Sequence, residues 1–235
     1  MFGKILNINP LELSGEEHRS LLSQHGVLVF RNHELSHEHQ KIVMGKYGKL
    51  QDWREQKAPL HASTGNTIIN LHNNDWLGKS RMGWHMDQTH IKNSYLPVRS
   101  LYCSYVDSVN VTEFADIKYL TDRILVDMPE FTEELSAGYR EAGIFTYRSL
   151  YSYCNHVNKL LLRYDSRIKF SSDEQTYKFK VYCENILNGN DIPKIAVQWK
   201  PFDMVIFDNN QTPHRRSIMN GECKLIRTTA KFWLE

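Results

Sequence analysis

Long apolar runs and an excess of one charge are both missing from this 235-residue chain. No stretch of eighteen apolar residues occurs, so the sequence predicts no membrane-spanning helix. Lys and Arg together number 29 against 27 Asp and Glu, a balance too even for a dedicated nucleic-acid binder or a polybasic membrane anchor. We therefore expect a protein that acts on neither nucleic acids nor membranes.

Cysteine is also scarce and shows no pattern. The four cysteines are scattered without a Cys-x-x-Cys pair, which argues against a disulfide framework and a zinc knuckle. The first residues, MFGKILNINPLEL, carry one lysine and a mixed run broken by Asn and Pro, unlike a secretory signal. These features predict reduced thiols and a cytoplasmic location.

The composition that remains is typical of a folded globular protein. Hydrophobic residues make up 41% of the chain, which is near the globular average and enough to bury a core. The length fits one large domain better than two small ones. No repeat or linker separates the halves, so we expect residues 1–235 to form a single domain.

Local patterns predict many short strands around a few helices. Helices are expected over residues 14–24, 36–47, 114–125, 129–139 and 173–187, and strands over 27–30, 67–71, 99–106, 145–147, 160–164, 196–199, 204–207 and 225–234. Residues 72–83 are rich in Asn, Gly and Ser, which predicts a loop that delivers the next segment to a site. This pattern predicts a mixed α+β, mainly β fold with a sandwich or jelly-roll core covered by helices.

Two segments carry candidate metal ligands. His85 and Asp87 are two residues apart, a spacing that places both side chains on one face of a strand. Far downstream, an apolar run from Met204 to Phe207 leads into a polar turn that ends at His214. Two histidines and one carboxylate form the facial set of non-haem Fe(II) oxygenases, which leaves the opposite face open. The His-x-Asp pair alone would favour an exposed polar pair on a strand.

The whole chain resembles the taurine dioxygenase (TauD/TfdA-like) family of Fe(II)/2-oxoglutarate-dependent dioxygenases. The similar segments, in the family's order, are HGVLVFRN at 25–32, KYGKL at 46–50, WHMD at 84–87, VTEFAD at 111–116 and WKPFDMVIFDN at 199–209, followed by His214. The resemblance implies a double-stranded β-helix (jelly-roll, clavaminate synthase-like) core with flanking helices.

The resemblance also implies roles for individual residues. His85, Asp87 and His214 would be the catalytic ligands of Fe(II), with 2-oxoglutarate and O2 as cosubstrates. Arg227 would bind the distal carboxylate of 2-oxoglutarate, since a guanidinium matches a carboxylate better than an ammonium does. Thr112 matches the family threonine whose hydroxyl hydrogen-bonds the cosubstrate.

Three basic residues, Arg81, Lys231 and Arg215, suggest that the substrate is a small anionic molecule, such as an amino acid, a sulfonate or a biosynthetic intermediate. Arg81 stands where taurine-specific relatives carry a small amide, which argues against taurine itself. Lys231 occupies the second basic position of the last strand, which meets an anionic group of the substrate in some relatives. The expected reaction is hydroxylation of an unactivated C–H bond with release of succinate and CO2. The chain is also compatible with a homo-oligomer.

Two other functions stay open. One is a non-catalytic metal-binding protein on the same fold, and the other is a cupin-like zinc hydrolase. The three ligands together with Arg227 favour the oxygenase, because a binding module does not need all four. At one departure from the family pattern, Phe202 replaces a turn glycine. We expect that turn to form, since type I turns tolerate most residues.

Overall fold

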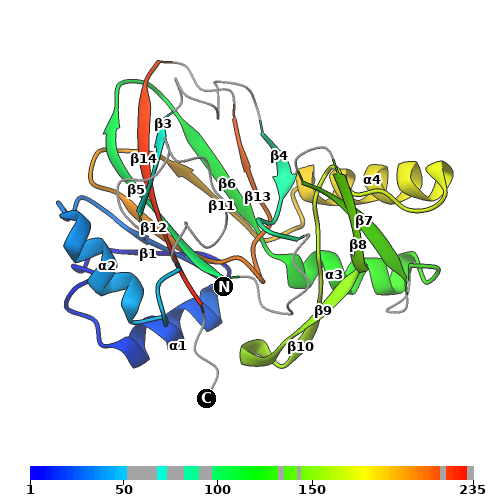
Figure 1. Cartoon of the computed structure of the whole chain (residues 1–235), viewed down its shortest axis with the longest axis horizontal. Helices are drawn as coiled ribbons and strands as arrows, with labels where there is room; N and C mark the ends of the chain where they lie inside the picture. Colours follow the sequence, from blue (N-terminus) through cyan, green and yellow to red (C-terminus); the bar gives the residue numbers. More distant parts are fainter. Residues whose placement is uncertain are drawn as a thin grey trace.

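The computed structural model describes residues 1–51, 68–72, 82–89, 97–131, 135–141, 144–217 and 221–231. For residues 68–72, 140, 141 and 144 it describes the backbone alone. The described chain is a strand-rich α+β protein in which two sheets stand at the centre, with helices and hairpins on either side (Figure 1). This confirms the predicted mixed class. None of the described helices is long and apolar enough to cross a membrane.

The larger sheet has six strands in the order β1-β2-β12-β5-β14-β3. Its strands are β1 (Lys4–Leu6), β2 (Val27–Phe30), β3 (Ile68–His72), β5 (Val98–Val106), β12 (Met204–Asp208) and β14 (Cys223–Ala230). β1 runs parallel to β2, and the other pairs are antiparallel. β2 and β12 are buried along their whole length, which explains the apolar runs at residues 27–30 and 204–207.

The smaller sheet has four strands in the order β11-β6-β13-β4. Its strands are β4 (Met82–His85), β6 (Val111–Ala115), β11 (Lys194–Gln198) and β13 (His214–Arg216). Its inner face packs on that of the larger sheet, where the rings of Phe114 and Phe207 lie 5.1 Å apart. Within this sheet His214 is paired opposite both His85 and Phe114, so strand register alone brings the two histidines together.

Two helices cover the outer face of the larger sheet (Figure 1). They are α1 (Gly15–His25) and α2 (His37–Gly45). Ser14 and Glu17 form the expected capping box at the start of α1. Leu22 of α1 and Val43 of α2 are fully buried in the apolar cluster that includes Leu28 of β2.

The remaining elements gather on the other side of the smaller sheet (Figure 1). They are α3 (Ile117–Asp127), β7 (Ser136–Glu141), β8 (Ile144–Ser149), β9 (Tyr151–Cys154), a 3₁₀ turn η3 (Asn155–Val157), β10 (Lys159–Leu162) and α4 (Asp173–Asn188). The helix expected over 129–139 is wrong, because residues 136–141 pair with β8 as a strand. The helix expected over 114–125 begins later, at Ile117, where the Asp116 carboxylate caps the Lys118 N–H. In both cases strand pairing overrides local helix propensity.

The turn before β12 forms, but not for the expected reason. Phe202 has a φ of 67°, in the left-handed region that costs a non-glycine residue roughly 1–2 kcal/mol. A type I turn would have required no such angle. Phe202 packs, partly buried, against the apolar cluster under α1 and α2, and this contact offsets the backbone cost.

Candidate metal centre

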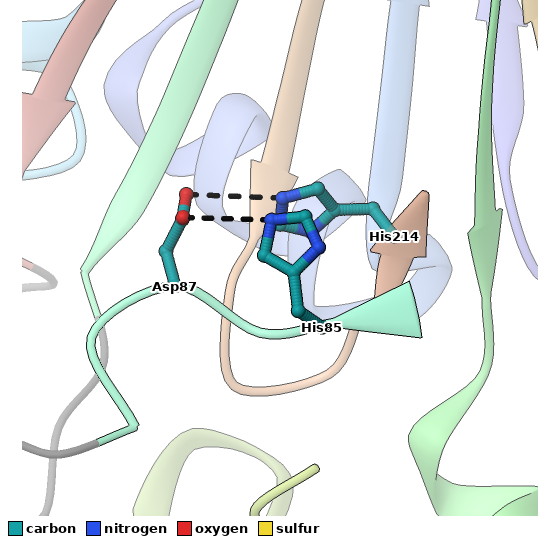
Figure 2. Close-up of side chains that lie close together, drawn as sticks. All are labelled: His85, Asp87 and His214. Carbon is teal, nitrogen blue, oxygen red and sulfur yellow. Dashed lines mark ion pairs between the residues drawn. The ribbon is translucent and has the colours of Figure 1, made fainter. Parts of the chain in front are cut away.

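Three side chains from two distant segments of the chain meet where β4 ends and β13 begins (Figure 2). His85 Nε2 lies 3.8 Å from Asp87 Oδ1, and His214 Nε2 lies 3.8 Å from Asp87 Oδ2. The two imidazole rings are 4.4 Å apart between centroids. One ligand atom from each residue lies within 4.8 Å of the other two. Separations of this size suit donors that share a single ion.

The backbone delivers the three ligands by pairing and by a turn. His85 ends β4 and His214 begins β13, and the two are direct neighbours in the sheet. Asp87 lies in the turn after β4 and not in the strand itself, and Gln88 adopts a φ of 62° there. The expected side-by-side placement of His85 and Asp87 on one strand face is therefore wrong, although the two side chains do converge.

Hydrogen bonds hold both imidazoles in the same tautomer. His85 Nδ1 donates to the Gly83 carbonyl at 2.8 Å, and His214 Nδ1 donates to the Thr212 carbonyl at 3.3 Å. A neutral imidazole that donates through Nδ1 keeps a lone pair on Nε2. Both lone pairs thus belong to the nitrogens nearest the Asp87 carboxylate, as a metal site with two histidines requires.

Hydrogen bonds from the loop after β12 hold the metal ligands in position. Asn209 Oδ1 accepts from the Asp87 backbone N–H at 3.0 Å, and Asn209 Nδ2 donates to the Asp87 carbonyl at 2.7 Å. Asp208 organises the turn toward His214 by accepting bonds from Asn210 and Gln211. Asn209 therefore ties the turn that carries Asp87 to the loop that leads to His214.

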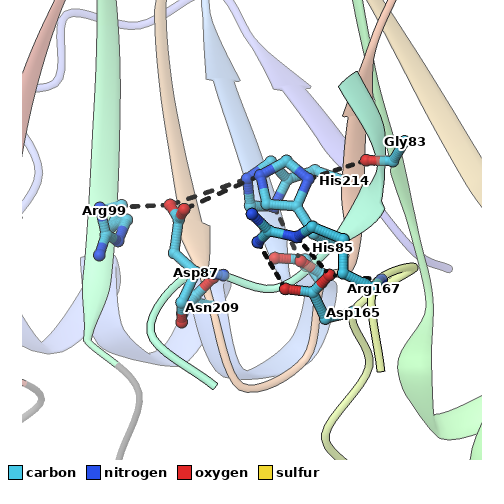
Figure 3. A network of polar contacts seen from close by, with 9 residues as sticks. Gly83, His85, Asp87, Arg99, Asp165, Arg167, Asn209 and His214 are labelled. Atoms are coloured by element: carbon cyan, nitrogen blue, oxygen red, sulfur yellow. Dashed lines mark hydrogen bonds and ion pairs between the residues drawn. The ribbon is translucent and has the colours of Figure 1, made fainter. Parts of the chain in front are cut away.

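Arg99 is the unexpected member of the site. It lies on β5, only 1% exposed, with Nη1 at 3.2 Å from Asp87 Oδ2 (Figure 3). Burial alone would raise the pKa of Asp87, but the cation of Arg99, followed by His214, Arg227 and His85, holds that pKa well below its usual value. Asp87 is therefore ionised at neutral pH and able to bind a cation.

His214 is held neutral by its surroundings. Burial, followed by the neighbouring His85, lowers the pKa of His214 to about 3. Its ring also packs against the rings of Phe114 and Phe207. A neutral imidazole is the form that binds metals, so no proton competes with a metal at this nitrogen near pH 7.

Two predicted cosubstrate residues lie on the inner faces of the sheets. Thr112 is buried on β6, and its Oγ1 accepts from Trp199 Nε1 at 2.9 Å, which leaves the hydroxyl hydrogen to donate elsewhere. Arg227 is partly buried on β14, opposite Leu101 of β5. Burial, followed by the like charge of Arg99, lowers the pKa of Arg227 to about 9, so it stays charged at neutral pH.

The described part of the structure does not connect the two predicted substrate residues with the metal ligands. Arg81 lies outside the described residues. Lys231 follows the end of β14 with an exposed side chain, and its backbone N–H donates to the Lys49 carbonyl. Among the described residues, Lys231 forms no hydrogen bond or ion pair with His85, Asp87 or His214.

Neither Arg99 nor the ion pair between Arg167 and Asp165 was predicted from the sequence. Arg167 donates to both Asp165 carboxylate oxygens, at 2.9 and 2.6 Å, and this pair lies beside His85 (Figure 3). Asp165 itself bridges to His85 through the backbone. A signal for Arg99 was present: an arginine within an apolar strand, at the same parity as buried Leu101.

A second group of residues of metal-ligand type consists of Cys154 and Asp208, which are buried, and His156, which is partly buried. His156 Nε2 pairs directly with Asp208 Oδ2, and Asp208 also accepts from Asn210 and Gln211. With its oxygens occupied, Asp208 acts here as a hydrogen-bond acceptor. This contact links the β9–β10 hairpin to the loop that leads to His214.

Comparison with families of known proteins gives a match. Residues 3–146 match the family described as taurine catabolism dioxygenase TauD, TfdA family. No curated protein matches the chain.

Solved structures of similar fold cover nearly the whole chain. A putative alpha-ketoglutarate-dependent taurine dioxygenase from Burkholderia xenovorans superposes with a TM-score of 0.78 at 14% identity, covering 99% of this chain and 90% of that one. PvcB from Pseudomonas aeruginosa superposes with a TM-score of 0.76 at 15% identity, covering 97% of this chain and 86% of PvcB. AAD-2, in complex with Mn(II) and N-oxalylglycine, superposes with a TM-score of 0.74 at 17% identity, covering 99% of this chain and 95% of AAD-2.

Proposed function

Because the chain belongs to the taurine catabolism dioxygenase TauD, TfdA family, we propose that it is a hydroxylase of an unactivated C–H bond in a small anionic molecule. The family agrees with the expected cofactors Fe(II), 2-oxoglutarate and O2, and the donor set of His85, Asp87 and His214 fits a divalent ion. The observation that carries the proposal is the convergence of two Nε2 atoms on one ionised carboxylate. We infer with it that residues 1–235 form a single jelly-roll (double-stranded β-helix) domain.

The chain's own residues would bind, orient and shield the reactants. His85 and His214 would hold the metal through Nε2 and Asp87 through a carboxylate oxygen, while Asn209 fixes the turn that carries Asp87. When bound, iron with 2-oxoglutarate supplies the oxidising chemistry, which is the cofactors' contribution and not the protein's. Phe114 and Phe207 pack on His214 and keep water from that side of the site.

Arg227 and Thr112 would hold the distal carboxylate of 2-oxoglutarate. Arg227 is a charged guanidinium on the inner face of β14, and Thr112 has a hydroxyl hydrogen to donate because Trp199 occupies its acceptor side. A guanidinium and a hydroxyl together give charge-assisted bonds to one carboxylate. The substrate would then approach from the side of the metal left open by the three ligands.

We propose an anionic substrate because Arg81 and Lys231 are both basic. Arg167 is a further cation beside His85, where it is ion-paired with Asp165 and has a side chain that is 57% exposed. A screen of small amino acids, sulfonates and other acids for stimulated 2-oxoglutarate consumption tests this class. A substrate without an acidic group, turned over equally by Lys231→Ala, would contradict it.

The reaction class has a direct test. Under argon, Fe(II) and 2-oxoglutarate should give the protein a weak visible charge-transfer band, and O2 with a substrate from the screen should then yield succinate and CO2. His85→Ala and Asp87→Ala should abolish succinate formation, whereas His39→Ala, which removes an exposed histidine of α2, should not.

Each alternative function predicts a different result. Metal binding without 2-oxoglutarate consumption would favour the non-catalytic metal-binding protein. Activity that needs no oxygen and ignores 2-oxoglutarate would favour the cupin-like zinc hydrolase. Succinate formation undiminished in both ligand variants would overturn the assignment of the iron site.

A further inference from the structure

We propose that Arg99 is a second cosubstrate-binding cation, which contacts the 2-oxo acid end of 2-oxoglutarate while Arg227 holds the distal carboxylate. This inference rests on the proposed function. It concerns a residue that lies outside the sequence motifs of the metal ligands.

The first support is the distance between Arg99 and the metal position. Arg99 Nη1 lies 3.2 Å from Asp87 Oδ2. A carboxylate oxygen lies about 2 Å from a metal that it binds, so this nitrogen lies within about 5 Å of the ion. The 2-oxo group and the C1 carboxylate of 2-oxoglutarate must both reach the same ion, so Arg99 borders the volume they would occupy.

The second support is the placement of the two arginines on neighbouring strands. Arg227 of β14 is paired opposite Leu101 of β5, and Arg99 is paired opposite Thr229. Arg99 and Leu101 share a strand face, so Arg99 and Arg227 are diagonal neighbours, a relation that spans about 7–8 Å between backbones. The two guanidinium groups are thus set along one inner face, with Arg99 at the end next to Asp87.

The third support is the balance of charge. Arg99 is 1% exposed and Arg227 is partly buried, and buried charges require compensation. The Asp87 carboxylate, which would also bind the metal, pairs with Arg99. A dianionic cosubstrate would bring one carboxylate to the metal and Arg99 and the other to Arg227, so its charges would match those of this face.

A purely structural role for Arg99 makes a different prediction. If Arg99 only orients Asp87, its loss should weaken the binding of the metal and leave cosubstrate affinity unchanged once the metal is saturating. If it contacts the 2-oxo acid end, its loss should weaken every 2-oxo acid, including one without a distal carboxylate. Arg227 should behave in the opposite way.

The experiment compares 2-oxoglutarate with 2-oxobutyrate, which keeps the 2-oxo acid end and lacks the distal carboxylate. Dissociation constants are measured anaerobically from the charge-transfer band at saturating Fe(II), and Mn(II) affinity is measured separately. Arg99→Met should weaken both acids by a similar factor, about 10- to 100-fold for a lost hydrogen bond between charged groups. Arg227→Met should weaken 2-oxoglutarate alone.

Two further variants keep the result interpretable. Arg31→Met removes an arginine that pairs with the buried Asp203 at the opposite end of β12, and it should bind both acids as the wild type does. Arg99→Lys keeps a charge beside Asp87, which protects the fold, and should recover part of the lost affinity. Equal affinities for both acids in wild type, Arg99→Met and Arg99→Lys would overturn the role of Arg99, whereas a wild type that binds neither acid would overturn the proposed function itself.

Discussion

Removal of the Asp87 carboxylate should destabilise the metal-free protein, because it leaves the buried guanidinium of Arg99 without its ion-pair partner. Breaking a buried ion pair from one side typically costs 3–5 kcal/mol. The Asp87 side chain is 23% exposed and Arg99 has further contacts, so we expect Asp87→Ala to lose about 2–3 kcal/mol, at or below the bottom of that range.

His85→Ala should cost less in the same metal-free protein. His85 loses one neutral hydrogen bond to the Gly83 carbonyl, worth about 1 kcal/mol net. Replacing both members of a buried pair with apolar groups can be nearly neutral. The double variant Asp87→Ala/Arg99→Met should therefore regain most of the stability that Asp87→Ala loses.

The assay is equilibrium urea unfolding with EDTA at pH 7, followed by tryptophan fluorescence. For a chain of this size, the loss expected for Asp87→Ala corresponds to a melting temperature lower by about 5–10 °C. An Asp87→Ala protein that unfolds at the wild-type urea concentration would refute the reasoning. So would a coupling energy below about 0.5 kcal/mol in the double-mutant cycle.

Three other predictions concern metal loading, pH and the second buried cluster. Mn(II) at about one hundred times its dissociation constant should stabilise the wild type by about 2.7 kcal/mol, and calorimetry should find no such gain in His214→Ala. Burial lowers the pKa of His18 from 6.5 to about 4. Between these two pH values the unfolded chain binds a proton at His18 and the folded chain does not. The free energy of unfolding of the wild type should therefore be highest above about pH 6.5 and fall by about 3 kcal/mol toward pH 4. Urea titrations of His18→Gln across this range should show a shallower decline, and an unchanged slope would contradict the assignment. His156→Ala removes the contact of His156 with Asp208 in the loop that leads to His214. It should weaken Mn(II) binding about 10- to 100-fold, as the loss of residues that orient metal ligands does. Unaltered Mn(II) binding would show that the loop holds its shape without His156.

Much of the candidate site follows from local sequence. The His-x-Asp pair and the polar turn before His214 mark candidate ligands, and the family resemblance selects His85, Asp87 and His214, which the structure brings together. Apolar runs such as residues 27–30 and 204–207 predict buried strands, and these predictions are confirmed. Such patterns are readable because each depends on neighbours in the chain.

Features that depend on distant pairing were not readable. Residues 136–141 look helical in isolation, but β8 supplies the hydrogen bonds that make them a strand. Arg99 meets Asp87 only because β5 runs beside β12 and β14 in the larger sheet. The conformation of Phe202 likewise depends on the apolar cluster it packs against, which its own turn sequence does not contain.

The bonds between Asn209 and the backbone of Asp87 have a consequence for how the protein acquires its metal. They hold the ligands in position before any ion arrives, so the site does not reshape itself around one particular element. Nitrogen and oxygen donors of this kind bind cobalt, nickel and copper more tightly than ferrous iron in the usual order of affinities. The identity of the resident ion then depends on which metal the cell supplies, and protein purified from a different host can carry an inactive one.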